Sequence, residues 1–154
     1  MINKIVYSIG HSNVTFDRFI DILKTLKIEY LIDVSSVPIS SYVPHFNKNN
    51  LENSLADYGI EYLYAGEKLG GRQKLDISKY AKTKEFKLGI NKIEDIIKTG
   101  ITAIMCSEKD FKKCHRRFIC DALINEGYNV IQFEVDNKKI DKHLQLSLFN
   151  GEKK

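Results

Sequence analysis

The sequence predicts an α/β fold, a three-layer sandwich around a mostly parallel five-stranded sheet of the Rossmann-like or flavodoxin-like kind. Short apolar runs with strand character alternate along the chain with segments whose apolar residues recur at helical spacing. The length of 154 residues and the 43% hydrophobic content suit a single compact domain. We therefore expect one domain over residues 1–135, followed by a lysine-rich C-terminal tail over 136–154.

The first half of the chain predicts three strands and two helices. Thr15 can cap the first helix, and Phe46 and Leu51 flank the cap residue Asn47 as a hydrophobic staple. Pro38 and Pro44 predict irregular backbone between the second strand and the second helix. The predicted strands are Lys4–Ile9, Tyr30–Val34 and Ile60–Tyr64, and the helices begin after Thr15 and after Asn47.

The second half begins with residues 65–80, which show no periodicity and contain three glycines, as is typical of lids and binding loops. Gly100 and Gly127 each follow a helical pattern, so both are predicted to end a helix, with Gly100 in the left-handed conformation. The tail has little pattern, and we expect it to dock a short element or to fray. The predicted elements are helices over Thr83–Lys98 and Phe111–Glu126 and strands over Ile101–Met105 and Asn129–Glu134.

Composition and patterning exclude several classes of protein. No apolar run is long enough to cross a bilayer, and the first residues do not resemble a signal peptide, so we expect a cytoplasmic protein with no membrane partner. Three cysteines cannot all pair within the chain, which argues against a disulfide framework.

Charge favours anionic partners without identifying one. The chain carries 24 basic and 20 acidic residues, for a net charge of +4, which falls short of the dense basic stripe of a dedicated nucleic-acid binder. Only four of the basic residues are arginines. Because the arginine fork binds carboxylate and phosphate in a way that lysine cannot, each arginine is a candidate for a specific role.

Polar residues follow the predicted strands at their carboxyl ends, whereas the opposite loops carry few such groups. In open α/β sheets ligands bind at the carboxyl edge, so this asymmetry predicts a single site there. We expect the side chains of His11 and Arg116 to meet in one crevice at that edge. The other candidates for this site are Ser12, Asp33, Ser40, Gly70, Gly71, Arg72, Cys106, Glu108 and His115.

Several of these residues have two interpretations. His11 suits a general acid or base but also a turn histidine that caps the next helix. Glu108 suits either catalysis or the dipole of the helix that follows. Local pattern favours a buried structural role for His115, while Arg116 points to the edge of the apolar arc and Arg117 suits a surface ion pair.

The cysteines suggest sharper chemistry that their spacing mostly fails to support. Cys106 follows a strand, where the nucleophile of a thiol phosphatase or a rhodanese lies, but Lys112 occupies the position of the phosphatase arginine. Cys106, Cys114 and His115 lack the paired Cys-x-x-Cys of a metal site. The sequence therefore predicts no metal and no cofactor.

These motifs together resemble the family known as domain of unknown function 488. The resemblance rests on Gly10-His11-Ser12, Asp33-Val34 with Pro38 and Ser40, Phe46-Asn47, Leu69-Gly70-Gly71-Arg72, Cys106-Ser107-Glu108 and Cys114-His115-Arg116-Arg117. It implies an α/β domain with a polar site at the strand ends, and it strengthens the candidacy of His115 and Arg116, but it implies no established reaction. This chain has Ser35 where the family commonly has an arginine.

The function that these observations favour is an enzyme acting on a phosphate-bearing substrate, a nucleotide or a nucleic acid. Arg72 and Arg116 would form the anion clamp, and the acid and base would come from the candidate histidines and Glu108, with Asp33 as an orienting group. One alternative is a non-catalytic module that binds nucleic acid or another anion. A second is a thiol-dependent enzyme that uses Cys106. The sequence indicates no oligomeric state.

Overall fold

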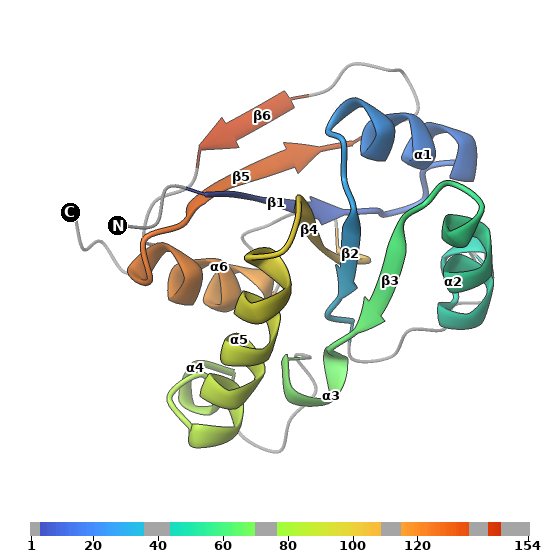
Figure 1. The fold of residues 1–154 in the computed structure, drawn as a ribbon. Helices are drawn as coiled ribbons and strands as arrows, with labels where there is room; N and C mark the ends of the chain where they lie inside the picture. Colours follow the sequence, from blue (N-terminus) through green and yellow to red (C-terminus); the bar gives the residue numbers. More distant parts are fainter. Residues whose placement is uncertain (1–3, 36–43, 70–76, 109–114, 136–141, 146–154) are drawn as a thin grey trace.

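The computed structural model describes residues 4–35, 44–69, 77–108, 115–135 and 142–145, which form an α/β sandwich with a six-stranded sheet between two layers of helices (Figure 1). This confirms the predicted fold class. The strands are β1 (Ile5–Gly10), β2 (Tyr30–Asp33), β3 (Glu61–Tyr64), β4 (Thr102–Cys106), β5 (Asn129–Glu134) and β6 (Lys142–Gln145). The helices are α1 (Phe16–Thr25), α2 (Lys48–Ala56), α3 (Gly66–Leu69), α4 (Ile77–Tyr80), α5 (Lys84–Ile97) and α6 (Arg116–Asn125), with a 3₁₀ turn η1 (Pro44–Phe46).

The strand order is β3-β2-β4-β1-β5-β6. The first five strands are parallel to their neighbours, and β6 joins the sheet antiparallel to β5. The five parallel strands lie within a residue or so of their predicted positions. The sequence pattern left open whether the segment 136–154 docks a short element or frays. β6 is a short strand from this segment that docks on β5.

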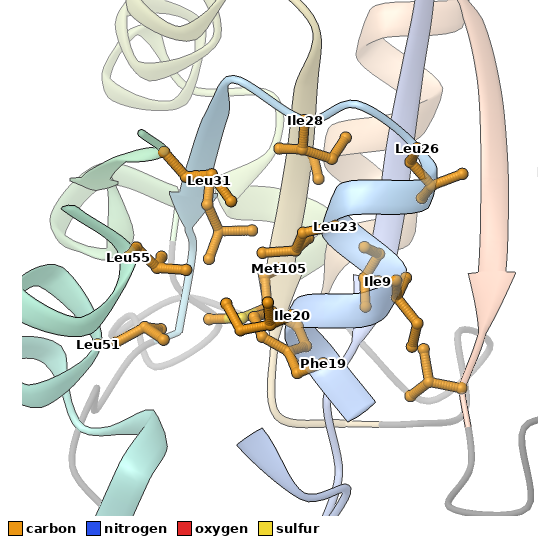
Figure 2. Packing of buried hydrophobic residues seen from close by; sticks show 14 of the residues in the cluster. Ile9, Phe19, Ile20, Leu23, Leu26, Ile28, Leu31, Leu51, Leu55 and Met105 are labelled. Atoms are coloured by element: carbon orange, nitrogen blue, oxygen red, sulfur yellow. The ribbon is translucent and has the colours of Figure 1, made fainter. Parts of the chain in front are cut away.

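Each face of the sheet has its own apolar core. On one face α1, η1 and α2 cover Ile9, Leu31 and Met105, and Figure 2 shows how α1 packs its apolar side onto these strands. On the other face α3, α4, α5 and α6 cover Ile32 and Ile104. Because side chains alternate along a strand, neighbouring residues serve opposite cores.

The connections place a topological switch point between β1 and β4. The chain leaves β1 through α1 on one face towards β2, whereas it leaves β4 through α6 on the other face towards β5. Adjacent parallel strands whose connections leave over opposite faces mark the usual place of ligand sites in open α/β sheets. The carboxyl ends of β1 and β4 are therefore the first place to look for a site.

The helix ends lie near their predicted positions. The hydroxyl oxygen of Thr15 accepts a hydrogen bond from the amide of Arg18, as predicted, and the hydroxyl oxygen of Thr83 accepts one from the amide of Phe86. Gly127 follows α6 with a positive φ of 100°. Gly100 has no such backbone, so the prediction of a left-handed helix end there was wrong. A Cβ at Gly100 would lie 2.7 Å from the Tyr30 ring, so glycine is needed for close packing.

The region 65–80, expected to lack structure, contains two short helices. Leu69 of α3 and Tyr80 of α4 belong to the core under α5 and α6, so the chain is anchored at both ends of this region. The helix predicted from Phe111 starts at Arg116, with His115 at its N-cap. No described helix has the length and the apolar character needed to pass through a membrane.

We expect Thr83→Ala to lower the free energy of unfolding by about 1 kcal/mol, because the amide of Phe86 loses its hydrogen-bond acceptor at the start of α5. Thr83→Ser keeps the hydroxyl and is the matched control. Urea denaturation of both variants measures the difference. Equal stability of the two variants would contradict a capping role for this hydroxyl.

Candidate functional site

The carboxyl ends of β2, β4 and β1 lie side by side in the sheet (Figure 1). Gly10 is paired with Cys106 and Asp33 with Met105, so the residues that follow these strands share one edge. The structure thus brings His11, Asp33 and Glu108 to the same edge from segments far apart in the sequence. Ser40, Gly70, Gly71, Arg72 and Cys114 lie outside the residues that the structure describes.

His11 is buried at the end of β1, with 4% of its surface exposed. Its ring stacks on Phe46 with the centroids 3.9 Å apart, and Nδ1 lies 2.8 Å from the carbonyl oxygen of Ser12. A carbonyl only accepts hydrogen bonds, so Nδ1 carries the proton and Nε2 has a lone pair. His11 therefore presents Nε2 as an acceptor in a fixed orientation.

No described residue forms a hydrogen bond with the Nε2 atom of His11. Every fully buried side-chain nitrogen or oxygen in the described part of the chain has a hydrogen-bond partner, so Nε2 is not completely buried. Burial lowers the pKa of His11 to about 4, and the nearby charges of His45 and Arg116 act in the same direction. The ring is neutral at neutral pH and can accept a hydrogen bond from a ligand.

The backbone around His11 extends the pairing of β1 with β4 beyond the strands. The amides of His11 and Ser12 donate to the carbonyl oxygens of Cys106 and Ser107 at 2.9 and 3.0 Å. Ser12 then turns away with a φ of 49°. A Cβ at Gly10 would lie 1.9 Å from the carbonyl oxygen of Glu108, so only glycine lets the two segments approach this closely.

Asp33 is a buried carboxyl group with two defined partners. Oδ1 accepts from the Ser35 amide at 2.9 Å, and Oδ2 accepts from the Tyr62 hydroxyl at 2.5 Å. Burial raises the pKa of Asp33, and its hydrogen bonds with Ser35 and Tyr62 partly oppose that effect. Because both oxygens have partners within the protein, this geometry suits an orienting group.

His115 and Glu108 lie beside the same edge. Nε2 of His115 is 2.7 Å from the carbonyl oxygen of Val34, so it carries the proton and ties the start of α6 to the end of β2. The positive field of His115 also reaches Asp33 and lowers its pKa. The side chain of Glu108 is exposed, while its carbonyl oxygen accepts a hydrogen bond from Arg116 at 2.7 Å. The carboxylate of Glu108 is thus accessible to a ligand.

Arg116 is fully buried, whereas the sequence pattern placed it at the edge of the apolar arc of its helix. Nη1 donates to the Ser8 hydroxyl at 2.7 Å and to Oε1 of Gln132 at 3.1 Å, Nη2 donates to the Glu108 carbonyl, and Nε donates to Cys106 Sγ at 3.1 Å. The guanidinium thus ties together β1, β4 and β5. A substrate-binding role for Arg116 stays a prediction.

The expectation that His11 and Arg116 meet in one crevice was wrong. Ser8 and Gly10 face Arg116 on the side of the sheet covered by α6, whereas His11 stacks on Phe46 on the side covered by α1. The physical reason is the alternation of side chains at the end of β1, which sends successive residues to opposite faces. His11 and Asp33 remain on one face.

Sequence reasoning missed the residues that hold these groups in place. Tyr62 hydrogen-bonds to Asp33, and Ser8 and Gln132 hydrogen-bond to Arg116. A signal was present, because Ser8 and Gln132 are polar residues inside strands that are otherwise apolar at the buried positions. A polar residue in a buried strand needs a partner, and Arg116 is that partner.

Comparison with known proteins identifies a family and no individual relative. The family model described as "Domain of unknown function DUF488" matches residues 15–123. No curated protein and no solved structure matches the chain. The matched region includes Asp33, Glu108 and Arg116, while His11 lies just before it.

We expect Arg116→Lys to lower the free energy of unfolding by about 2 kcal/mol or more, because an ammonium cannot reach all the partners of the guanidinium in three strands and in the segment after β4. Arg117→Lys is the matched control, since Arg117 is half-buried and packs over the Phe118 ring, and a loss below about 0.5 kcal/mol is expected. Denaturation curves of both variants measure the contrast. Equal losses would mean that the buried network does not depend on Arg116.

The pKa of His11 also predicts how stability depends on pH. The value of about 4 in the folded protein lies below the ordinary 6.5, so the unfolded chain binds more protons between these pH values. This contribution to stability is complete above pH 6.5 and is lost as the pH falls towards 4, by about 3 kcal/mol at most. Unfolding free energies of the native protein and of His11→Gln, measured from pH 4 to pH 7, should converge as the pH falls. Parallel curves would contradict the low pKa.

Proposed function

The chain belongs to the family described as "Domain of unknown function DUF488", whose description assigns no reaction, and we propose that it is an enzyme acting on a phosphate-bearing substrate, a nucleotide or a nucleic acid, at the carboxyl edge of the sheet. The observation that carries this proposal is His11. Its ring is held by Phe46 and by the Ser12 carbonyl beside the switch point, and its Nε2 lone pair has no hydrogen-bond partner among the described residues. An oriented acceptor without a partner, in a ring that is otherwise held in place, suits acid–base chemistry.

The low pKa of His11 fits a site for an anion. A ring with a pKa of about 4 is a weak base in the free protein, but a bound phosphate favours the charged form of the imidazole. Binding of the substrate would therefore raise the pKa of His11 towards the range in which a histidine transfers protons efficiently. This couples the basicity of His11 to the presence of an anionic substrate.

The other candidate catalytic residues differ in how accessible their side chains are to a ligand. Glu108 has an exposed carboxylate and suits a general acid or base, whereas Asp33 has both oxygens occupied and suits orientation. His115 is tied to Val34 and serves to position the start of α6, with a catalytic role through its ring as the alternative. The phosphate itself would be held by Arg72 and the backbone of Gly70 and Gly71, with Ser12 and Ser40 beside it, as the sequence predicts.

A thiol-dependent reaction at Cys106 is a second candidate, and one contact favours it. Nε of Arg116 donates to Cys106 Sγ at 3.1 Å, and a guanidinium next to a sulfur favours the thiolate form. Against this, only 2% of Cys106 is exposed, so a substrate would have to displace neighbouring chain. His11 is the better placed of the two groups.

The test compares binding and turnover in matched variants. Inorganic phosphate, nucleoside monophosphates and diphosphates, and short oligonucleotides are screened by amide NMR shifts at Gly10, Ser12 and Ser107, and binders are assayed for product by chromatography. We expect His11→Gln to retain binding and to lose turnover by about 100-fold or more. His45→Gln is the control, because His45 also contacts Phe46 but donates its ring proton to the Val14 carbonyl.

Three outcomes would count against the proposal. Binding without turnover would favour the non-catalytic module, in which case affinity should fall steeply with added salt. Full activity of His11→Gln would exclude His11 as the acid or base. Loss of activity in Cys106→Ser with His11→Gln active would favour the thiol enzyme instead.

A further inference from the structure

A groove with a volume of about 450 Å³ runs along the free edge of the sheet, at β3. Among the described strands β3 pairs only with β2, and it lies between α2 on one face and α5 on the other (Figure 1). The size is within the range of pockets that hold small molecules, about 300 to 1,000 Å³. The groove has no part in the function proposed above.

The floor of the groove is apolar. Leu63 and Ala65 come from β3 and its end, and Ile93 and Ile96 come from α5. Gly89 of α5 allows α3 to close one side, because a Cβ there would lie 2.8 Å from the Leu69 side chain. An apolar floor of this kind gains free energy when an apolar or aromatic group covers it.

The rim of the groove carries charges of both signs. Lys48, Lys68 and Lys92 line it together with Glu52 and Glu67. Lys68 is already paired with Glu85 at 3.1 Å, and the Lys48 ammonium lies 4.8 Å from the centre of the Tyr64 ring.

Lys92 differs from the other two lysines of the rim. Among the described residues no acidic group lies within salt-bridge distance of its ammonium. The rim therefore has a cation available to a ligand, and a second cation, placed over an aromatic ring, lines the same groove. This arrangement complements a compact negative charge.

The groove is connected to the carboxyl edge through two tyrosines of its wall. The Tyr62 hydroxyl donates to Asp33 and the Tyr64 hydroxyl donates to the Ser35 carbonyl at 2.8 Å. A ligand in the groove would pack against the same side chains that hold the end of β2. A ligand in the groove would thus alter the surroundings of Asp33 through Tyr62.

We propose that this groove binds a small amphipathic anion, an apolar or aromatic body that carries one phosphate or carboxylate group. The apolar body covers Leu63, Ile93 and Ile96, and the anionic group lies at Lys92 and Lys48. The inference does not rest on the proposed function. None of the residues proposed for that chemistry lines the groove, and the link between the two sites is the hydrogen bond from Tyr62 to Asp33.

The test uses adenosine 5′-monophosphate, octanoate, adenosine and inorganic phosphate as probes of the full chain, with amide NMR shifts at Leu63, Ala65, Gly89 and Ile96 as the readout. We expect a probe with both an apolar body and a charge to bind the groove, and adenosine and phosphate alone to bind about tenfold more weakly or not at all. Lys92→Glu should weaken binding of the amphipathic anion by about fivefold. Lys87→Glu makes the same charge change on another part of α5 that does not line the groove, and it should leave binding within about twofold.

Groove amides that do not respond to either amphipathic anion would overturn the proposal, and so would equal effects of Lys92→Glu and Lys87→Glu. Equal binding of adenosine and of its monophosphate would overturn the assignment of an anionic ligand. Shifts confined to Gly10, Ser12 and Ser107 would overturn the groove site while leaving the proposed function intact. Shifts confined to the groove would support the groove site and count against that function.

Discussion

The arrangement of the carboxyl edge depends on one buried guanidinium. Arg116 has no exposed surface, and its three nitrogens donate to groups in β1, β4, β5 and the segment after β4. A buried cation is tolerated only when its donors are satisfied, so these partners must keep their positions for the fold to be stable. Gly10 follows from the same constraint, because a side chain there would collide with both the Glu108 carbonyl and Arg116.

This network sets the geometry of the opposite face. Arg116 holds the segment after β4 close to Gly10, and the amides of His11 and Ser12 then pair with Cys106 and Ser107. The pairing fixes the direction in which His11 leaves the chain, towards Phe46 and away from Arg116. Arg116 thus supports the segment that orients the histidine, and the separation of the two across the sheet is a consequence of strand alternation.

Sequence patterns predicted the parallel strands and the edge at which polar residues gather, because apolar periodicity and the position of loops after strands are local properties. They did not predict what each polar side chain contacts. Arg116 and Arg117 are neighbours of the same type, and only the polar Ser8 and Gln132 in facing strands distinguish the buried one. Gly100 shows the same limit, since its role comes from the Tyr30 ring of a distant strand rather than from its own helix end. Residues 65–80 looked structureless because two four-residue helices are too short to show a periodic pattern.

The charge of Arg116 also affects the protonation of His11. Burial removes water from His11 and favours its neutral ring, and the positive charge of Arg116 adds to that preference from the other face of the sheet. Under the proposed function, an anion at the edge would offset the positive field and stabilise the protonated ring. The free protein keeps its acceptor uncharged, and the charge needed for proton transfer would appear with the ligand. Such a histidine would discriminate between anionic and neutral ligands through its own titration.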